Sequence, residues 1–422
     1  MAPSPARGRD WGAVWDPHVM VGHIGQRIAT YRRRRGLSQA ALAGLVGRSE
    51  SWMSQIERGV RSVDRLSVLM DLARVLQVEV ESLSGRPWPS EPNHSAVSDG
   101  LGDLRRVLTN YASLTGGVET ATTGASAAEL SARITHAHRA YQAADYDLTI
   151  RLVPGLVSAV ESDQGRRDGP RRDALLSCVS AYVVAAKLVT KLGAGDLAIL
   201  AADRAARAAV AVDSLAARSM AAYQVTCALM RSSQADDAER VAVEMATQVA
   251  PHAKSDDPEL VSLCGALWLV AAVIAARRTD RGEAWSRLDQ AERLAWVLGA
   301  DGNHGWTGFG PTNVAIHRVS VAAVLGDPRE ALRAAARIDV SRLPAGLSSR
   351  RAQINLDLAW AHAQRKRDAE ATLQLLEAER VAPQVIRHNL TAQRIVRNLL
   401  ARGSRAQTSV LVSLARRSGV LE

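Results

Sequence analysis

Hydrogen-bonding side chains are concentrated in residues 49–55, and their types suit contacts with the edges of DNA bases. Gln55 can make two hydrogen bonds to adenine, Glu50 can accept one from the amino group of cytosine, and Ser51 can bond to several bases. Trp52 has two interpretations, because its indole could stack on a sugar or a thymine methyl, or pack on a neighbouring helix. These side chains are therefore chemically suited to the major groove.

Two short helices joined by a tight turn are predicted to hold these side chains. Ser38 is a good N-cap for the first helix, and Ser49 is one for the second. Gly47 permits the turn between them, and Gly59 lies where the second helix should end. Apolar residues recur at helical spacing on the inward faces of both helices. They are Ala41, Leu42, Leu45, Met53 and Ile56.

Two motifs frame this pair of helices. Ser-Gln-x-x-Leu-Ala stands at residues 38–43, and Ser-x-Ile-Glu-x-Gly stands at residues 54–59. An arginine-rich segment precedes them, and an amphipathic segment, RLSVLMDLARVLQV, follows. From about residue 24 to residue 85 the chain resembles the XRE family of lambda-repressor-like helix-turn-helix domains, and the required structural context agrees with the motifs.

The resemblance implies roles for three further residues. Gln39, at the start of the first helix of the motif, corresponds to a residue that holds a DNA phosphate. Arg32 and Glu57 correspond to positions that form an internal salt bridge between the preceding helix and the end of the recognition helix. The N-terminal half of that second helix corresponds to the part that meets base edges.

Cations in the flanking turns are candidates for phosphate contacts. Arg48, Arg58 and Arg61 are placed where side chains can reach the sugar-phosphate backbone and fix the register without reading sequence. Ser49 joins this candidate set. The alternative is that these arginines are only solvated surface charges. The run at residues 32–35 also resembles a phosphate clamp, although the internal pairing is favoured for Arg32.

Composition limits the class of protein. The chain has 422 residues, a formal net charge of +10 and a pI near 10.1, which suit a polyanionic partner. Its arginines are spread along the chain, so this argument is diluted. Cys178, Cys227 and Cys264 lie far apart in apolar helical patterns, which predicts reduced thiols in a cytoplasmic protein. The apolar run at residues 263–276 is expected to be too short to span a bilayer, and the N-terminus has no apolar signal region.

Four segments are predicted from changes in composition. Residues 1–22 are expected to be a flexible tail, and residues 23–85 the DNA-binding domain. Residues 86–125 are rich in Pro, Gly and Ser and are expected to be a linker with one helix at 101–113. Residues 126–422 show long alanine-rich helical patterns separated by short turns. The predicted fold class is therefore all-α, with a lambda-repressor-like helix-turn-helix domain followed by an α-superhelix.

Helical hairpins recur through this last segment. Aligning them on a small residue early in each second helix gives positions 40 to 49 residues apart. Twelve residues before each lies another small or β-branched residue, where a first helix would cross its partner closely. This register is typical of stacked helix pairs. The second-helix positions are Thr149, Ala198, Ala238, Ala284, Ala331 and Ala371, and the first-helix positions are Ala137, Ala186, Thr226, Ala272, Val319 and Ala359.

The pattern resembles the tetratricopeptide repeat, although the period exceeds the usual 34 residues and the tryptophan and proline signals are incomplete. The resemblance implies that the first helices line a concave groove. That groove would mix amide and basic groups with an apolar middle, which suits an extended peptide or an elongated small molecule. The candidate groove residues are His138, Lys187, Tyr223, Asn313, His317, Gln353 and Trp360.

A glycine-rich segment at residues 299–313 interrupts the repeats. One interpretation is a ligand-contacting lid made of His304, Trp306 and Phe309. The other, slightly favoured, is a long loop between repeats whose aromatic residues fill the core. Pro311 is expected to start the helix that follows.

Motifs for catalysis and for metal or cofactor binding are not found. The glycines at residues 302–310 follow no predicted strand and lack Gly-Lys-Ser/Thr, and there is no Cys-x-x-Cys or Gly-x-Ser-x-Gly. His136 and His138 point to different faces of a helix, which argues against a metal site. No enzymatic activity, metal or cofactor is expected.

Together these observations predict a cytoplasmic transcription regulator that is nucleoid-associated when bound to double-stranded DNA. Its order of parts resembles that of peptide-responsive quorum-sensing regulators. A homodimer is expected to read an inverted repeat, and the repeat domain to sense a peptide or small-molecule effector. The main alternative is that the repeats bind a protein partner as a scaffold, and a third is a repressor controlled only by its own concentration. No membrane association is expected.

Overall fold

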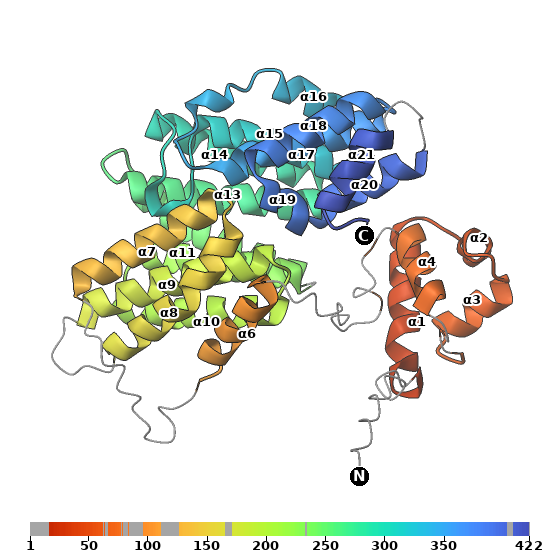
Figure 1. Cartoon of the computed structure of the whole chain (residues 1–422), viewed down its shortest axis with the longest axis horizontal. Coiled ribbons are helices and arrows are strands. Elements are labelled where there is room, and N and C mark those ends of the chain that lie inside the picture. The colour runs from red at the N-terminus through yellow and green to blue at the C-terminus, as the bar shows by residue number, and fades with distance from the viewer. Residues whose placement is uncertain are drawn as a thin grey trace, which may run out of the picture. The chain divides into compact units, whose positions relative to one another are not determined.

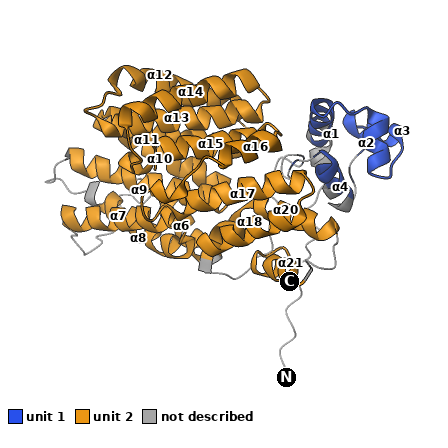
Figure 2. Ribbon diagram, turned by 90° about the horizontal axis from the view of Figure 1, so that it is seen from above, with its two compact units in different colours: residues 1–93 blue, residues 94–422 orange. Residues whose placement is uncertain are grey.

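The structure is a computed structural model. It describes residues 17–61, 63, 66–76, 78, 83, 96–110, 126–164, 171–232, 234–402 and 408–421. Residues 1–16 of the expected flexible tail lie outside the described residues, whereas residues 17–22 are helical and belong to the first helix. Every regular element in the described part of the chain is helical, which confirms the all-α prediction. The chain divides into two compact units, residues 1–93 and residues 94–422 (Figure 2).

The first unit is built from four described helices around one apolar core. Ile28, Leu42, Met53 and Leu69 come from the four helices in turn, and each is fully buried. Burial of such side chains is the main source of stability in a unit of this size. The helices are α1 (Pro17–Arg34), α2 (Gln39–Leu45), α3 (Glu50–Glu57) and α4 (Leu66–Leu76).

The second unit, called the helical body here, stacks six helical hairpins (Figure 1). Each first helix packs on its own second helix and on the first helix of the next hairpin. The first helices are α7 (Ala127–Gln142), α9 (Arg171–Lys191), α11 (Leu215–Arg231), α13 (Pro258–Arg277), α15 (Pro311–Val324) and α17 (Ser348–Gln364). The second helices are α8 (Tyr146–Gln164), α10 (Gly195–Val212), α12 (Ala235–Val249), α14 (Arg281–Leu298), α16 (Pro328–Ala335) and α18 (Asp368–Val381).

Small residues at the helix crossings explain why the hairpins pack closely. All twelve positions that the sequence register selected are fully buried, from Ala137 in α7 to Ala371 in α18. Small side chains at such positions let two helix backbones approach each other. The helical repeat prediction is thereby confirmed at the level of architecture.

The turns within the hairpins share one backbone feature. A residue with positive φ lies five positions before the aligned small residue in each described turn. Glycine adopts this left-handed conformation without strain, whereas Ala, Thr and Lys pay a steric cost. The repeat is therefore regular in backbone geometry even where the residue type varies. The residues are Ala144, Gly193, Thr279, Gly326 and Lys366.

The ends of the body contact each other. Short helix α19 (Pro383–His388) follows the sixth hairpin, and Gln384 accepts a hydrogen bond from the backbone amide of Asp147 at 2.9 Å. The ring of His388 packs edge-on against Tyr146. The last helices, α20 (Leu390–Arg402) and α21 (Thr408–Arg417), complete the core shared with the first hairpins. The repeats thus form a closed body rather than an open arc.

The helix that we expected within the linker belongs to the helical body. It is α6 (Ala96–Leu108), which begins earlier than the predicted residue 101. Leu104 and Leu108 are fully buried, and Gly100 lies so close to Ile150 of α8 that a Cβ there would come within 2.5 Å. The other linker residues, 86–95 and 111–125, lie outside the described residues.

Helices α9 and α13 correct one expectation about length. Both helices have the length and composition of a membrane span, because α13 continues beyond the apolar run of residues 263–276 at both ends. Most of α13 is buried against neighbouring helices, and α9 carries Lys187 and Lys191 on its inner face. A core helix of a globular body can have the same length and apolar composition, so the two helices are weak evidence for a membrane.

Candidate functional site

The recognition helix α3 is anchored by two buried residues and one cap. Met53 and Ile56 are at most 1% exposed and attach the helix to the core of the first unit. The Ser49 hydroxyl accepts a hydrogen bond from the backbone amide of Trp52 at 3.2 Å, as an N-cap should. Ser38 caps α2 in the same way through Ala41.

The outward side of α3 carries the side chains that we expected to read bases. Glu50 and Ser51 are exposed, and Gln55 is partly exposed. Trp52 is partly buried and packs on the core, and the Arg48 guanidinium lies 5.7 Å from its ring centre. The structure therefore favours the packing interpretation of Trp52, while the other three side chains point away from the core.

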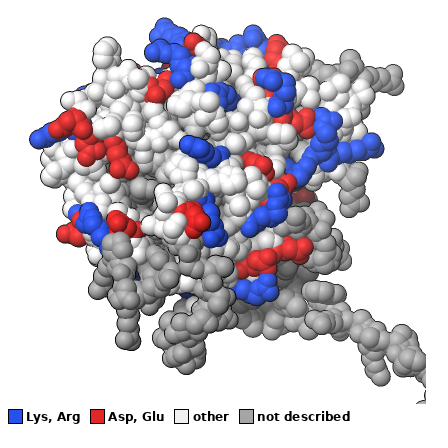
Figure 3. Space-filling model, turned by 60° about the vertical axis from the view of Figure 1, so that its left-hand side comes forward, with Lys and Arg blue, Asp and Glu red and all other residues white. Residues whose placement is uncertain are grey.

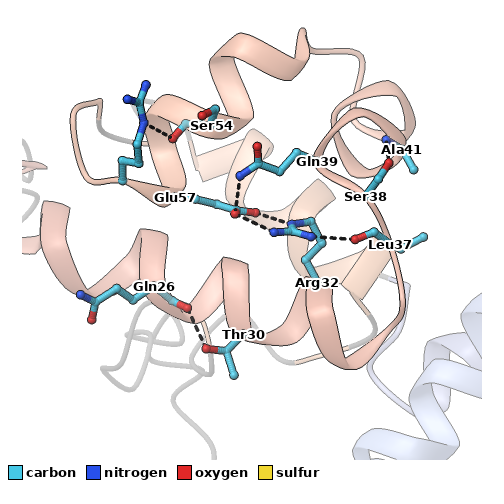
Figure 4. Close-up of polar contacts among 10 residues, drawn as sticks. Gln26, Thr30, Arg32, Leu37, Ser38, Gln39, Ala41, Ser54 and Glu57 are labelled. Atoms are coloured by element: carbon cyan, nitrogen blue, oxygen red, sulfur yellow. Dashed lines mark hydrogen bonds and ion pairs between the residues drawn. The ribbon is translucent and has the colours of Figure 1, made fainter.

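A polar network joins α1, α2 and α3 (Figure 4). Arg32 donates to both carboxylate oxygens of Glu57, at 2.5 and 2.9 Å, and to the backbone oxygen of Leu37 at 2.7 Å. Gln39 donates to the same carboxylate at 2.7 Å. Burial alone would raise the pKa of Glu57, but these hydrogen bonds lower it instead. Gln39, expected to hold a phosphate, thus uses one N–H of its side-chain amide within the domain, and its second N–H is a further donor.

Exposed arginines surround this network. Arg48 and Arg61 are exposed, and Arg58 is exposed with its Nε donating to the backbone oxygen of Ser54 at 3.3 Å. None of the three forms an ion pair within the described residues. Of the run at 32–35, Arg35 donates to Leu76 O at 3.1 Å. Arg32 and Arg35, the first and last residues of the run, therefore make hydrogen bonds within the domain.

A close backbone approach fixes the angle between α1 and α3. A Cβ at Gly25 would lie 2.0 Å from the backbone oxygen of Ile56. Only glycine allows this approach without displacing the recognition helix. Sequence reasoning missed this residue, because a glycine inside a helical pattern shows no partner until the fold is known.

Comparison with known proteins agrees with this geometry. Residues 23–83 match a protein family that is described as a helix-turn-helix domain. Over 60 residues the chain is 38% identical to the HTH-type transcriptional regulator SinR of Bacillus subtilis (strain 168), and equally to SinR of Bacillus licheniformis. The matches cover 14% of this chain and 54% of each relative. The chain thus spans about half the length of these relatives.

In the helical body, outside the helix-turn-helix domain, several expected groove residues gather around Arg350 in α17. Burial lowers the pKa of Lys187 to about 7, and the Arg350 charge adds to this. Burial also lowers the pKa of His317 to about 3, again with help from Arg350. Burial raises the pKa of Tyr223, which the adjacent Arg350 opposes. Lys187, Tyr223 and His317 are therefore neighbours in one electrostatic environment, although they come from three helices.

The glycine-rich loop crosses to the first two hairpins. Gln142 and Asn303 exchange two hydrogen bonds of 2.9 Å through their side-chain amides. The Trp306 indole stacks on His138, and its backbone oxygen accepts a hydrogen bond from Lys187 Nζ at 3.0 Å. The loop thus bridges the inner faces of α7 and α9.

The aromatic residues of this loop have different roles. Phe309 is fully buried against Gly265, where a Cβ would meet its ring at 2.0 Å, so it fills the core. His304 is exposed. Trp306 is partly buried beside His138 and Lys187. The core-filling interpretation is thus supported for Phe309, and only Trp306 lies next to the expected groove residues.

The remaining expected groove residues lie in other settings. Asn313 is 1% exposed, and its backbone oxygen is paired with Nδ1 of His317 at 2.9 Å. Gln353 donates to Asp357 at 3.0 Å. Trp360 is partly buried and packs on two apolar clusters. Sequence reasoning missed Arg350, which lies one helical turn before Gln353 on α17, so extending the register by one turn could have found it.

Proposed function

We propose that this protein is a DNA-binding transcription regulator whose helix-turn-helix domain places α3 in the major groove. The match of residues 23–83 to a helix-turn-helix family carries the proposal. The exposed positions of Glu50, Ser51 and Gln55 support it, because side chains at the start of a recognition helix contact base edges. Trp52, also expected to contact a base, contributes through its packing beneath this surface.

Phosphate contacts position the domain in this proposal. Arg48, Arg58 and Arg61 are exposed and form no ion pair with any residue that the structure describes, so we propose that their charges are available to the DNA backbone. Gln39 and Ser49 stand at the N-terminal ends of α2 and α3, where helix termini favour phosphate. Each contact of this kind makes binding more sensitive to salt.

A dimer is proposed to read an inverted repeat. Helix-turn-helix dimers bind half-sites about 34 Å apart, one turn of DNA. We propose that the helical body supplies the dimer contact and senses an effector. Such an effector must bind two states of the regulator unequally if it is to change DNA affinity. We propose that the protein is located in the cytoplasm and is associated with the nucleoid when it is bound to DNA.

Selection of DNA tests the proposal. The full chain is mixed with random fragments of a GC-rich bacterial genome, the bound fragments are sequenced, and affinity is measured at several salt concentrations. A short inverted repeat bound far more tightly than random DNA is the expected result. Binding that depends on salt but not on sequence, with and without cell extract, would contradict a sequence-specific regulator.

A further inference from the structure

Three partly buried cations form a cluster inside the helical body. Lys187 and Lys191 lie one turn apart on α9, and Arg350 is in the first turn of α17. The charge of Arg350 acts on both lysines. Arg231 and Arg277, at the ends of α11 and α13, are exposed, and the charge of Arg231 also reaches Lys191. We call these five residues the cationic cluster.

No carboxylate balances the cationic cluster. None of its five members forms an ion pair within the described residues. The exterior differs, since positive and negative side chains are interspersed on the face in Figure 3. A buried cation elsewhere in the body, Arg287, is paired with Glu239 at 2.5 Å. One carboxylate, that of Asp357, does lie among the first helices, but it accepts hydrogen bonds from Ser320 and Gln353 and forms no ion pair with the cluster within the described residues.

Such a cluster costs stability when it is empty. Cations removed from water are unfavourable unless an anion neutralises them. Arg350 adds to this cost, because a positive charge in the first turn of a helix opposes the helix dipole and no acidic residue accompanies it there. Burial lowers the pKa of Lys191 to about 8 and that of Lys187 to about 7, and the charge of Arg350 acts in the same direction. An anionic ligand that binds these cations would offset this unfavourable free energy.

We propose that the cationic cluster binds a small anionic effector and holds its carboxylate or phosphate oxygens between Arg350 and the two lysines. This rests on the proposed function, because it names the chemical class of the effector. Arg350 offers a planar fork of donors that fits either oxyanion, and the lysine amines add N–H donors whose protonated form a bound anion favours. The Tyr223 hydroxyl beside Arg350 adds a neutral hydrogen-bonding group. Arg231 and Arg277, which are exposed, attract the anion from solvent.

The cluster is connected to the loop that crosses the body. Lys187 donates to the backbone oxygen of Trp306, which stacks on His138 of the first hairpin. The Lys187 ammonium has three donors, so a bound anion shares this amine with the Trp306 oxygen and draws it towards itself. Occupation of the cluster thus changes the contact between the glycine-rich loop and α7, and in this way couples the site to the packing of the hairpins.

Lysine footprinting tests the proposal on the wild-type full chain. The chain has only four lysines, so Lys254 and Lys366 serve as internal controls outside the cluster. Amines are acetylated at pH 7.5 with inorganic pyrophosphate, with citrate, or with sodium chloride at matched ionic strength, and are quantified by mass spectrometry. At about ten times its Kd, a bound anion should slow labelling of Lys187 and Lys191 about tenfold. The two probes distinguish phosphate from carboxylate recognition.

Variants separate a specific site from general charge effects. Arg350→Gln should abolish the protection, whereas Arg293→Gln should keep it, because Arg293 of α14 is exposed and forms no ion pair among the described residues. Equal effects on all four lysines, protection that persists in Arg350→Gln, or no protection by pyrophosphate or citrate would each overturn the proposal. Circular dichroism of each variant checks that it is folded.

A DNA titration then separates the site from the proposed function. The operator affinity of the full chain is measured with and without the protecting anion. Protection with a changed affinity supports both proposals. Protection without a change keeps the anion site but removes its role as the effector site of a regulator. Sequence-specific binding without protection keeps the regulator and overturns the anion site.

Discussion

The Trp306 indole lies flat on the His138 imidazole, with ring centres 4.5 Å apart and planes inclined by 7°. One residue belongs to the glycine-rich loop and the other to the first hairpin, so the stack joins parts of the body that are distant in sequence. His138 is fully buried and its Nε2 lies 3.1 Å from the backbone oxygen and the hydroxyl of Ser180. Burial lowers the pKa of His138 well below its usual value, which keeps the ring neutral in the stack.

Removal of this stack should loosen the body. We expect Trp306→Ala to lower its free energy of unfolding by about 2 kcal/mol, less than for a fully buried tryptophan, because Trp306 is only partly buried. Urea unfolding followed by circular dichroism measures the loss. Trp296→Ala is the matched control, since that side chain is 81% exposed and should change little. Equal losses in both variants would contradict a bridging role.

The ion pair between Arg32 and Glu57 should be essential to the helix-turn-helix domain. Glu57→Gln leaves a partly buried guanidinium without its partner, and we expect a loss of about 3 kcal/mol. The side chains are only 11% and 5% exposed, so solvent does little to compensate. Hydrogen exchange of the α1 and α3 amides in the full chain reports the loss locally. Glu50→Gln, in the same helix but exposed, should leave this exchange unchanged.

Two glutamines should separate base reading from positioning. Gln55→Ala should weaken binding to the selected operator by about 1–3 kcal/mol and leave random DNA almost unaffected. Gln39→Ala should weaken both, because its proposed contact is to a phosphate and it also supports Glu57. Fluorescence anisotropy with operator and scrambled DNA measures the difference, with the exposed Gln26→Ala as control. These roles would be refuted if the ratio of operator affinity to scrambled-DNA affinity were the same for Gln55→Ala and Gln39→Ala.

The buried lysines should give the body a particular pH dependence. The pKa of Lys187 is about 7 in the folded chain, whereas an unfolded lysine titrates near ~10.4. Between these values the unfolded state binds more protons, so the stability contributed by this position rises with pH. Below pH 7 both states are charged and the full penalty remains. Its charged and titratable neighbours, Arg350, Cys227 and His138, affect only where the rise occurs.

Comparison with a variant isolates this effect. The difference in unfolding free energy between the wild type and Lys187→Met should shift in favour of the wild type as pH rises from 7 to 10. Lys366→Met, at an exposed turn, should show no such shift. Urea unfolding at several pH values in this window measures both. A difference that stays constant with pH would mean that Lys187 titrates normally.

Local signals in the sequence determined the helices and their repeat. Capping residues such as Ser38 and Ser49, the glycines of the turns and the 3.6-residue spacing of apolar side chains act within a few residues, so they can be read without the fold. The small residues from Ala137 to Ala371 were found in the same way, because a close helix crossing excludes large side chains. The helix-turn-helix motif likewise has a short, fixed spacing.

Only the tertiary structure decided which distant residues meet. The approach of Gly25 to Ile56, the hydrogen bond from Gln39 to Glu57 and the bridge from Trp306 to His138 depend on how whole helices pack. The gathering of Arg350 with Lys187 and Lys191 has the same origin, because each helix supplies a cation that looks like ordinary surface charge by itself. Their missing counter-charge is a property of the assembled interior, where the low dielectric makes an unpaired charge costly.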